Sequence, residues 1–225
     1  MGIDGRIWGP HLWIFVSHII MKYPIKPSNL DIVIMKSFFE SIANTLPCEI
    51  CQEHFQHAII SGVKDIKLPP LDFSVLNSRD KLFKWWYDFH DYVNKNKVIE
   101  DNEKRTVSPD YEKVYKMYSE YIDKDFWQPH FWYYVSIVII NYECKQTTDV
   151  MKLKNFLEYM AKETPKYNFH KYIVETLKYD TIKSREKLFK WFYDFRIKHD
   201  TEYSLSYDST KKYYNKMLSD ISMSI

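Results

Sequence analysis

The sequence has 225 residues, enough for one large domain or two small ones, and 45% of them are hydrophobic, enough to bury a sizeable core. Aromatic residues make up 18% of the chain but only 4 residues are glycine, which argues against glycine-rich nucleotide loops and against an all-β fold with many tight turns. Basic and acidic residues nearly balance, 32 against 30, so the composition predicts neither nucleic acid nor an anionic membrane as the main partner.

The periodicity of the apolar residues predicts helices. Apolar side chains recur at three- and four-residue spacing over residues 10–21, 32–43, 81–93 and 111–122. Ser78 is an N-cap candidate before the third of these segments, and Ser108, followed by Pro109 and Asp110, has the pattern of a helix start before the fourth. Since no run shows the alternation of a strand bounded by hairpin turns, we predict an all-α fold.

The second half of the chain repeats the first. Two motifs recur almost unchanged: IWGPHLWIFVSHII (7–20) returns as FWQPHFWYYVSIVII (126–140), and SRDKLFKWWYDFH (78–90) returns as SREKLFKWFYDFR (184–196). A weaker echo links residues 115–122 with 215–222. We therefore predict a duplicated unit with domains at 1–123 and 124–225, each a bundle of about four long helices plus a shorter one.

Two of the chain's 3 cysteines stand in the segment LPCEICQEHF (46–55) with the spacing Cys-x-x-Cys. Pro47 before Cys48 suits the first turn of a helix, where backbone N–H groups and the helix dipole favour thiolate over thiol. In such a helix the sulfurs of Cys48 and Cys51 can close a small, reducible disulfide. The segment therefore indicates a redox couple.

Two other interpretations of the pair remain open. Cys48, Cys51, His54 and His57 are four potential zinc ligands, although a continuous helix separates the first from the last by about 13–14 Å, too far for one tetrahedral ion. The two cysteines could instead be small residues of the core.

Three motifs, in this order along the chain, resemble the Erv/ALR family of FAD-linked sulfhydryl oxidases. They are WGPHLWIFV followed by Tyr-Pro (8–24), PCEICQEHF (47–55) and HDYVN (90–94). The resemblance covers about residues 5–120 and implies a four-helix bundle with a short fifth helix that holds FAD at one end. It also implies the reaction, in which a dithiol is oxidised to a disulfide and O2 is reduced to H2O2.

The resemblance also implies roles for single residues. Cys48 would exchange with the substrate thiol, and Cys51 would face the flavin. The residues expected to contact the cofactor are Arg6, Gly9, Trp13, Ser17, His54, His90, Val93, Asn94 and Lys97. Two places depart from the family pattern: Ser17 stands where the family usually has His, and Asp91 replaces the first Asn of the third motif.

The second half lacks the chemistry that the resemblance implies for the first. Lys166 and Phe169 stand where the first half has its two cysteines, and Arg196 stands where it has His90. We expect a degenerate Erv-like domain kept for its shape or for binding a partner. It would pack on the first half as a pseudo-dimer, or the whole chain would form a homodimer.

The cysteine count bears on the substrate. Many family members carry further cysteine pairs as a shuttle, whereas here only Cys144 remains, which follows the apolar run 131–140 and is expected to be buried and dispensable. The chain would then oxidise a protein dithiol or a small redoxin directly. The alternative function is a non-enzymatic helical adaptor, with or without zinc, that retains the motifs by descent.

The sequence also carries an expectation about location. The apolar run 131–140 is half as long as the roughly 20 residues that a membrane span needs, so no membrane span is expected. The first residues lack the basic and apolar regions of a signal peptide. A minimal oxidase of this kind resembles the versions carried by large cytoplasmic DNA viruses, so we expect the cytoplasm of a host cell or the virion.

Overall fold

The computed structural model describes residues 3–96, 108–124, 126–164 and 168–222. Within these ranges the chain is helical and forms no strand; the one isolated bridge there joins Val63 and Leu68. The predicted all-α fold class is confirmed. None of the helices in the described part of the chain is long and apolar enough to cross a membrane.

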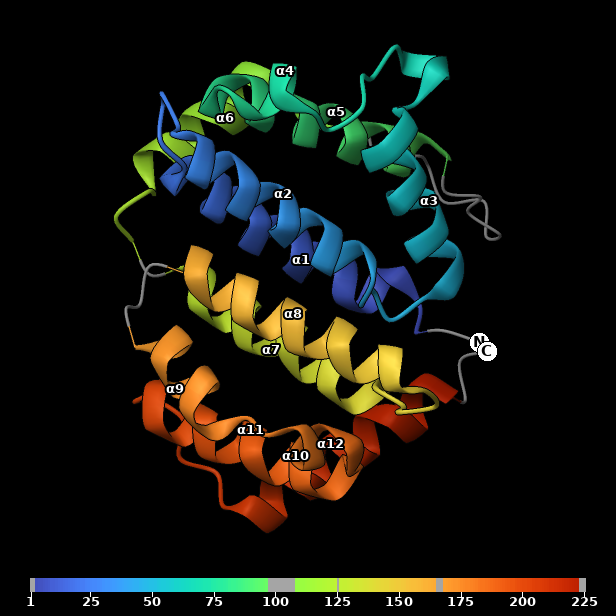
Figure 1. Cartoon of the computed structure of the whole chain (residues 1–225), viewed down its shortest axis with the longest axis vertical. Coiled ribbons are helices and arrows are strands. Elements are labelled where there is room, and N and C mark those ends of the chain that lie inside the picture. Colours follow the sequence, from blue (N-terminus) through green and yellow to red (C-terminus); the bar gives the residue numbers. More distant parts are fainter. Residues whose placement is uncertain (1–2, 97–107, 125, 165–167, 223–225) are drawn as a thin grey trace.

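The first half of the chain forms one set of helices, coloured blue to green in Figure 1. These helices are α1 (Gly5–Lys22), α2 (Asn29–Ala43), α3 (Glu49–Ser61), the 3-10 turn η1 (Lys64–Ile66), α4 (Phe73–Leu76), α5 (Arg79–Asn96) and α6 (Tyr111–Glu120). The first three predicted segments fall within α1, α2 and α5, and the fourth, 111–122, extends two residues past the end of α6.

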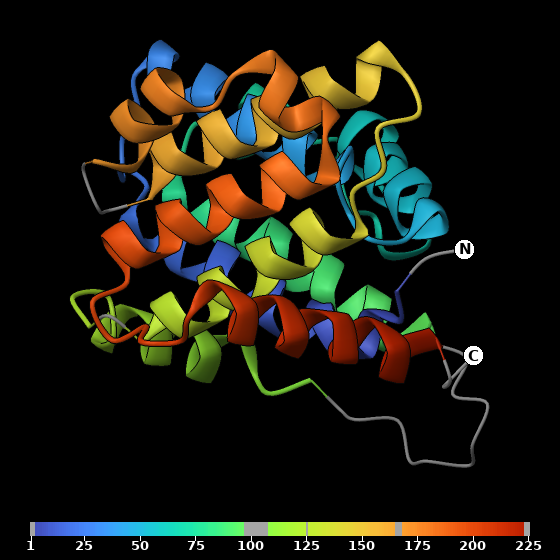
Figure 2. The same ribbon diagram turned by 90° about the horizontal axis from the view of Figure 1, so that it is seen from below.

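The second half forms a second set, coloured yellow to red. Its helices are α7 (Trp127–Asn141), α8 (Thr147–Glu163), α9 (Phe169–Thr176), α10 (Tyr179–Lys183), α11 (Arg185–His199) and α12 (Tyr207–Ser222). Figure 2, seen from below, brings the outer helices α9 to α12 to the front.

Side-chain caps fix where several helices begin. Ser28 and Asp31 form a reciprocal capping box at the start of α2, and the Ser184 hydroxyl accepts from the Lys187 N–H at the start of α11. The predicted start of α6 was placed two residues too early. Asp110, not Ser108, is its N-cap, because the Asp110 carboxylate accepts the first free backbone N–H groups of the helix.

The two halves meet through their first two helices. Helix α1 packs along α7 and α2 packs along α8, so these four helices form the centre of the molecule in Figure 1. Helices α5 and α6 contact the other side of α1. Because α1 is covered on both sides, its buried residues extend around the helix instead of forming one stripe.

The hydrophobic core is continuous across the two halves. Phe15 of α1 is fully buried, and its ring lies 6.4 Å from Phe38 of α2, 5.3 Å from Phe131 and 6.2 Å from Trp127. The boundary near residue 124 therefore separates segments of sequence that share one core. The division into two duplicated domains stays a prediction.

Candidate redox site

The two cysteines of the Cys-x-x-Cys segment are joined as a disulfide at the start of α3, with their Cα atoms 5.2 Å apart. Cys48 is the N-cap of this helix, and its Sγ accepts from the Cys51 N–H at 3.3 Å. Pro47 therefore precedes the helix instead of occupying its first turn. Its carbonyl accepts from the Ile3 N–H at 2.6 Å, which ties the segment to the start of α1.

The position of Cys48 at a helix N-terminus has an electrostatic consequence. The first N–H groups of α3 lack partners within the helix, and they present partial positive charge. When the disulfide is reduced, this end of the helix stabilises a thiolate on Cys48 over a thiol. Both cysteines are only partly buried, so a reacting group can approach them.

The zinc interpretation is not favoured by this geometry. The sulfurs of Cys48 and Cys51 are bonded to each other, and His54 and His57 are exposed on α3. Throughout the described ranges, no three His, Cys, Asp or Glu side chains are grouped so that they could hold a metal ion. The interpretation as inert core residues is also weakened, since the pair lies at the edge of the core.

Aromatic side chains connect the disulfide helix to α1 and α5. Phe55 of α3 stacks on Phe89 of α5 at 5.1 Å, and Phe89 lies 6.0 Å from Trp13 of α1. Trp13 in turn stacks on His90 with ring centres 4.1 Å apart and an angle of 27°. Asn94, one turn further along α5, lies 3.2 Å from His90 Nε2. The structure thus brings together three of the predicted cofactor residues.

The other predicted cofactor residues differ in exposure, and Gly9 lies beside Trp13 of this cluster. Gly9 precedes Trp13 by one turn, and a Cβ atom there would lie 3.9 Å from the indole nitrogen. Val93 is partly buried, His54 is exposed on α3, and Arg6 is exposed at the start of α1 with an ion pair to Asp4. Lys97 lies outside the described residues.

Ser17, which departs from the family pattern, is buried between α1, α5 and α6. Its hydroxyl accepts from the Trp86 indole N–H at 3.1 Å and also bonds to Tyr118. Ser17 is only 6% exposed. Its hydrogen-bonding capacity is therefore used inside the bundle, a role that the motif did not indicate because both partners are distant in sequence.

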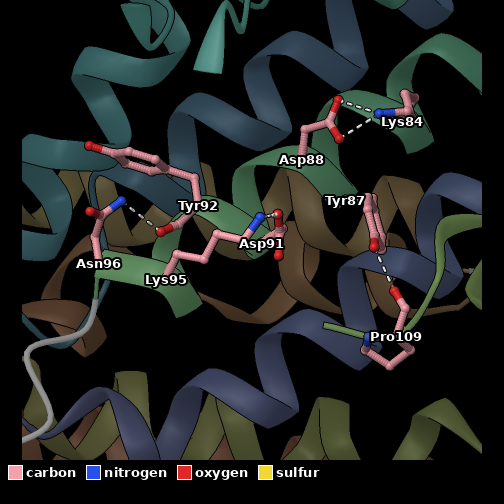
Figure 3. Close-up of polar contacts among 8 residues, drawn as sticks. All are labelled: Lys84, Tyr87, Asp88, Asp91, Tyr92, Lys95, Asn96 and Pro109. Atoms are coloured by element: carbon pink, nitrogen blue, oxygen red, sulfur yellow. Dashed lines mark hydrogen bonds and ion pairs between the residues drawn. The ribbon is translucent and has the colours of Figure 1, made fainter. Parts of the chain in front are cut away.

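Asp91, the second departure, makes a local ion pair. Figure 3 shows its carboxylate bonded to Lys95, one turn further along α5, at 2.5 Å. Burial alone would raise the pKa of the Asp91 carboxyl, but the hydrogen bond and the positive charge of Lys95 oppose this effect, and the pKa is lowered. On the same helix the Tyr87 hydroxyl donates to the Pro109 carbonyl at 2.5 Å, which holds the start of α6 against α5.

In the second half, protein side chains fill the place that corresponds to the Trp13–His90 cluster. Arg196 stands where His90 does, and its guanidinium lies 3.8 Å over Tyr203 and 5.7 Å from Trp132. It donates to the Tyr214 hydroxyl at 2.8 Å and pairs with Asp200 at 3.1 Å. A planar cofactor would have to displace this network. The sequence indicated the loss of His90, but not the residues that replace it.

Cys144 lies in the connection between α7 and α8 and is exposed. The expectation that it is buried was wrong, because α7 ends at Asn141 and the apolar run does not continue as helix to the cysteine. The Cys144 thiol donates to the Gln146 carbonyl at 3.8 Å.

The chain is similar in sequence to known proteins across this site. The model of the Erv1 / Alr family matches residues 10–113. A putative FAD-linked sulfhydryl oxidase of Invertebrate iridescent virus 6 is 35% identical over 92 residues, which cover 41% of this chain and 80% of the relative. The chain therefore belongs to the Erv1 / Alr family.

Two further relatives match a similar length of the chain. A putative FAD-linked sulfhydryl oxidase of Invertebrate iridescent virus 3 is 34% identical over 94 residues, 42% of this chain and 58% of the relative. A probable FAD-linked sulfhydryl oxidase of Acanthamoeba polyphaga mimivirus is 34% identical over 87 residues, 39% of this chain and 56% of the relative. The match thus spans a little over half the length of these two relatives.

Proposed function

We propose that the protein is an FAD-linked sulfhydryl oxidase that converts protein dithiols to disulfides and reduces O2 to H2O2. The observation that carries the proposal is the Cys48–Cys51 disulfide at the start of α3, a helix whose Phe55 is linked through Phe89 to the partly exposed rings of Trp13 and His90. The names of the relatives, which are FAD-linked sulfhydryl oxidases, support the same activity.

The residues on α1 and α5 fit a planar cofactor. Trp13 and His90 are flat, already stacked on each other and partly exposed, and Gly9 leaves the indole edge of Trp13 without a covering side chain. Asn94 adds an amide beside the imidazole. Arg6, Val93, His54 and Lys97 would complete the contacts. FAD bound here would accept an electron pair from the reduced cysteines and pass it to O2.

The exchange between substrate and enzyme needs only the sulfur atoms of the pair. A substrate thiolate attacks Cys48 Sγ, a mixed disulfide forms, the Cys48–Cys51 bond breaks, and Cys51 leaves as a thiolate with the electron pair. The second substrate thiolate then attacks the substrate sulfur of the mixed disulfide and releases Cys48. The substrate leaves as a disulfide, and the two enzyme cysteines hold its two electrons.

The start of α3 assists this exchange. The helix N-terminus stabilises the negative charge that appears on Cys48 when the mixed disulfide is resolved. We assign the exchange to Cys48 because it lies before the first turn of α3, whereas Cys51 lies within the helix that also carries Phe55.

The substitution Cys51→Ser tests the proposal. It should abolish the oxidation of dithiothreitol while FAD stays bound, because it removes one sulfur of the pair and leaves the Trp13–His90 cluster intact. Cys144→Ser is the matched control, and it should oxidise dithiothreitol at the rate of the unmodified protein. Undiminished turnover by Cys51→Ser, measured as oxygen consumption, would contradict the mechanism.

A further inference from the structure

A groove leads to Cys48 between the two halves of the chain. One wall belongs to the first half and contains the α2–α3 connection with Cys48 and the start of α3 with Glu49 and Gln52. The opposite wall belongs to the second half and contains the end of α7, the α7–α8 connection and the first part of α8. The volume of the groove is about 320 Å³, within the ~300–1,000 Å³ of ligand-sized pockets.

Each wall carries polar side chains that have no hydrogen-bond or ion-pair partner among the described residues. Asn141, at the end of α7, has no hydrogen-bond partner for its side-chain amide within the described ranges. Lys152 of α8 and Glu49 of α3 are exposed on opposite walls, and neither forms an ion pair with any described residue. The Asn141 amide can donate to and accept from the backbone of an extended polypeptide, and Lys152 and Glu49 can pair with its charged side chains.

The cysteine content requires that a substrate reach Cys48 directly. The chain has 3 cysteines, and two of them form the Cys48–Cys51 pair, so no second pair exists to relay electrons. Every substrate thiol that attacks Cys48 must therefore approach its sulfur from outside. The groove contains Cys48 in its wall and offers such an approach.

We propose, on the basis of the function proposed above, that this groove binds an extended cysteine-bearing segment of a protein dithiol and directs its thiol to Cys48. The second half of the chain, which has no cysteine pair of its own, forms the wall opposite Cys48. Its contribution is to bind the protein substrate. A small dithiol such as dithiothreitol needs no such wall and reaches Cys48 without it.

The substitution Asn141→Trp tests the proposal by filling the groove from the side opposite Cys48. The kcat/KM for reduced, unfolded ribonuclease A should fall about tenfold or more, which corresponds to the loss of ~1.4 kcal/mol of binding. The kcat/KM for dithiothreitol should stay unchanged, which also reports that the variant is folded. Asn155→Trp, at an exposed place on α8 outside the groove, is the matched control and should resemble the unmodified protein with both substrates.

A chemical modification gives a second test that does not depend on the folding of a variant. In the oxidised protein Cys144 is the free cysteine, and its neighbours Glu143 and Lys145 line the groove. Attachment of a polyethylene glycol maleimide to Cys144 should slow the oxidation of reduced ribonuclease A and leave that of dithiothreitol unchanged. Cys144→Ser, treated in the same way, should be unaffected.

Three outcomes would overturn the proposal. Equal loss with both substrates would mean that the groove does not distinguish a protein dithiol from a small one, and no loss with ribonuclease A would mean that the groove is not the docking site. A large loss in untreated Cys144→Ser, confined to ribonuclease A, would make Cys144 a relay cysteine and contradict direct attack on Cys48. Failure of the unmodified chain to oxidise dithiothreitol would instead contradict the proposed function itself.

Discussion

Trp13 and Trp132 hold corresponding places in the two halves but have different surroundings. Trp13 is partly exposed and stacks on His90, whereas Trp132 is 2% exposed and lies among Phe131, Phe195 and Arg196. The same residue type is therefore accessible in one half, where we propose that FAD binds, and enclosed by packing in the other. The surroundings, not the residue, decide which role is available.

This difference predicts contrasting effects of one substitution. Trp13→Leu removes the flat ring but keeps apolar bulk, and it should weaken FAD binding about fivefold, since ring contacts contribute on the order of 1 kcal/mol. Trp132→Leu should leave FAD binding unchanged and lower the free energy of unfolding by less than the ~3–5 kcal/mol of a Trp→Ala truncation. The measurement is a fluorescence titration of each apoprotein with FAD, and equal weakening in both would contradict the assignment of the cofactor to the first half.

Among single residues, the sequence predicted those that belong to short motifs. The Cys-x-x-Cys spacing predicted the Cys48–Cys51 pair, and the family resemblance named Trp13 and His90 as residues of one cofactor site. The use of Ser17 by Trp86 and the filling of the second half by Arg196 and Tyr214 depend on partners many residues away. Such partners can be found only when the helices are placed against each other.

At the scale of elements, the contact between α1 and α7 contains a pair of histidines. His11 Nδ1 and His130 Nδ1 lie 2.9 Å apart, and the His11 ring stacks on Tyr133 at 4.0 Å. Burial and, second, the neighbouring His130 lower the pKa of His11 to about 4, and burial lowers the pKa of His130. The two rings are therefore neutral when the halves are packed together at neutral pH.

This contact predicts a loss of stability in acid. Between pH 6.5 and about 4 the unfolded chain binds more protons at His11 than the folded chain does, so stability falls as the pH falls through this window. Glu163 acts in the opposite sense, because burial and the nearby Asp31 raise its pKa to about 7, and its contribution to stability falls as the pH rises from 4.5 to 7.

Substitution of the two histidines separates their effect on stability from that of Glu163. The double variant His11→Gln, His130→Gln keeps Glu163, so the difference between its melting temperature and that of the unmodified protein isolates the histidines. The melting temperature of the unmodified protein should fall more steeply from pH 7 to pH 5 than that of the double variant. The exposed His57→Gln is the control. Parallel curves for all three proteins would show that the histidine pair does not titrate as described.

Periodicity predicted the long helices but not their starts or the short helices. α4 and α10 span 4 and 5 residues, too few for a helical period to be visible in the sequence. The ring contacts also adjust the predicted correspondence of α3 and α9. Tyr172 stacks on Phe195 as Phe55 stacks on Phe89, which favours Asn168 over Phe169 as the counterpart of Cys51.

At the scale of the whole molecule, the repeat predicted that the halves would pack together, but not by which faces. The packing of α1 on α7 buries the most apolar helix of each half against the other. Because a short connection holds the halves at a high effective concentration, even a weak interface would stay closed. We propose that the second half serves as a built-in second subunit.

This arrangement predicts a monomer in solution. Light scattering should give a mass near 27.4 kDa, because the faces of α1 and α7 that would pair in a dimer are already covered within one chain. A mass about twice this value at micromolar concentration would show that another face of the molecule pairs two copies.

We propose that one half of the chain carries the redox site with its cofactor and that the other half binds no cofactor. The decisive measurement is the number of FAD molecules per chain, from the flavin absorbance near 450 nm and the protein concentration of the purified protein saturated with FAD. We predict a ratio of one FAD per chain. A ratio of zero would contradict the proposed oxidase, and a ratio of two would contradict the assignment of the second half as a degenerate copy.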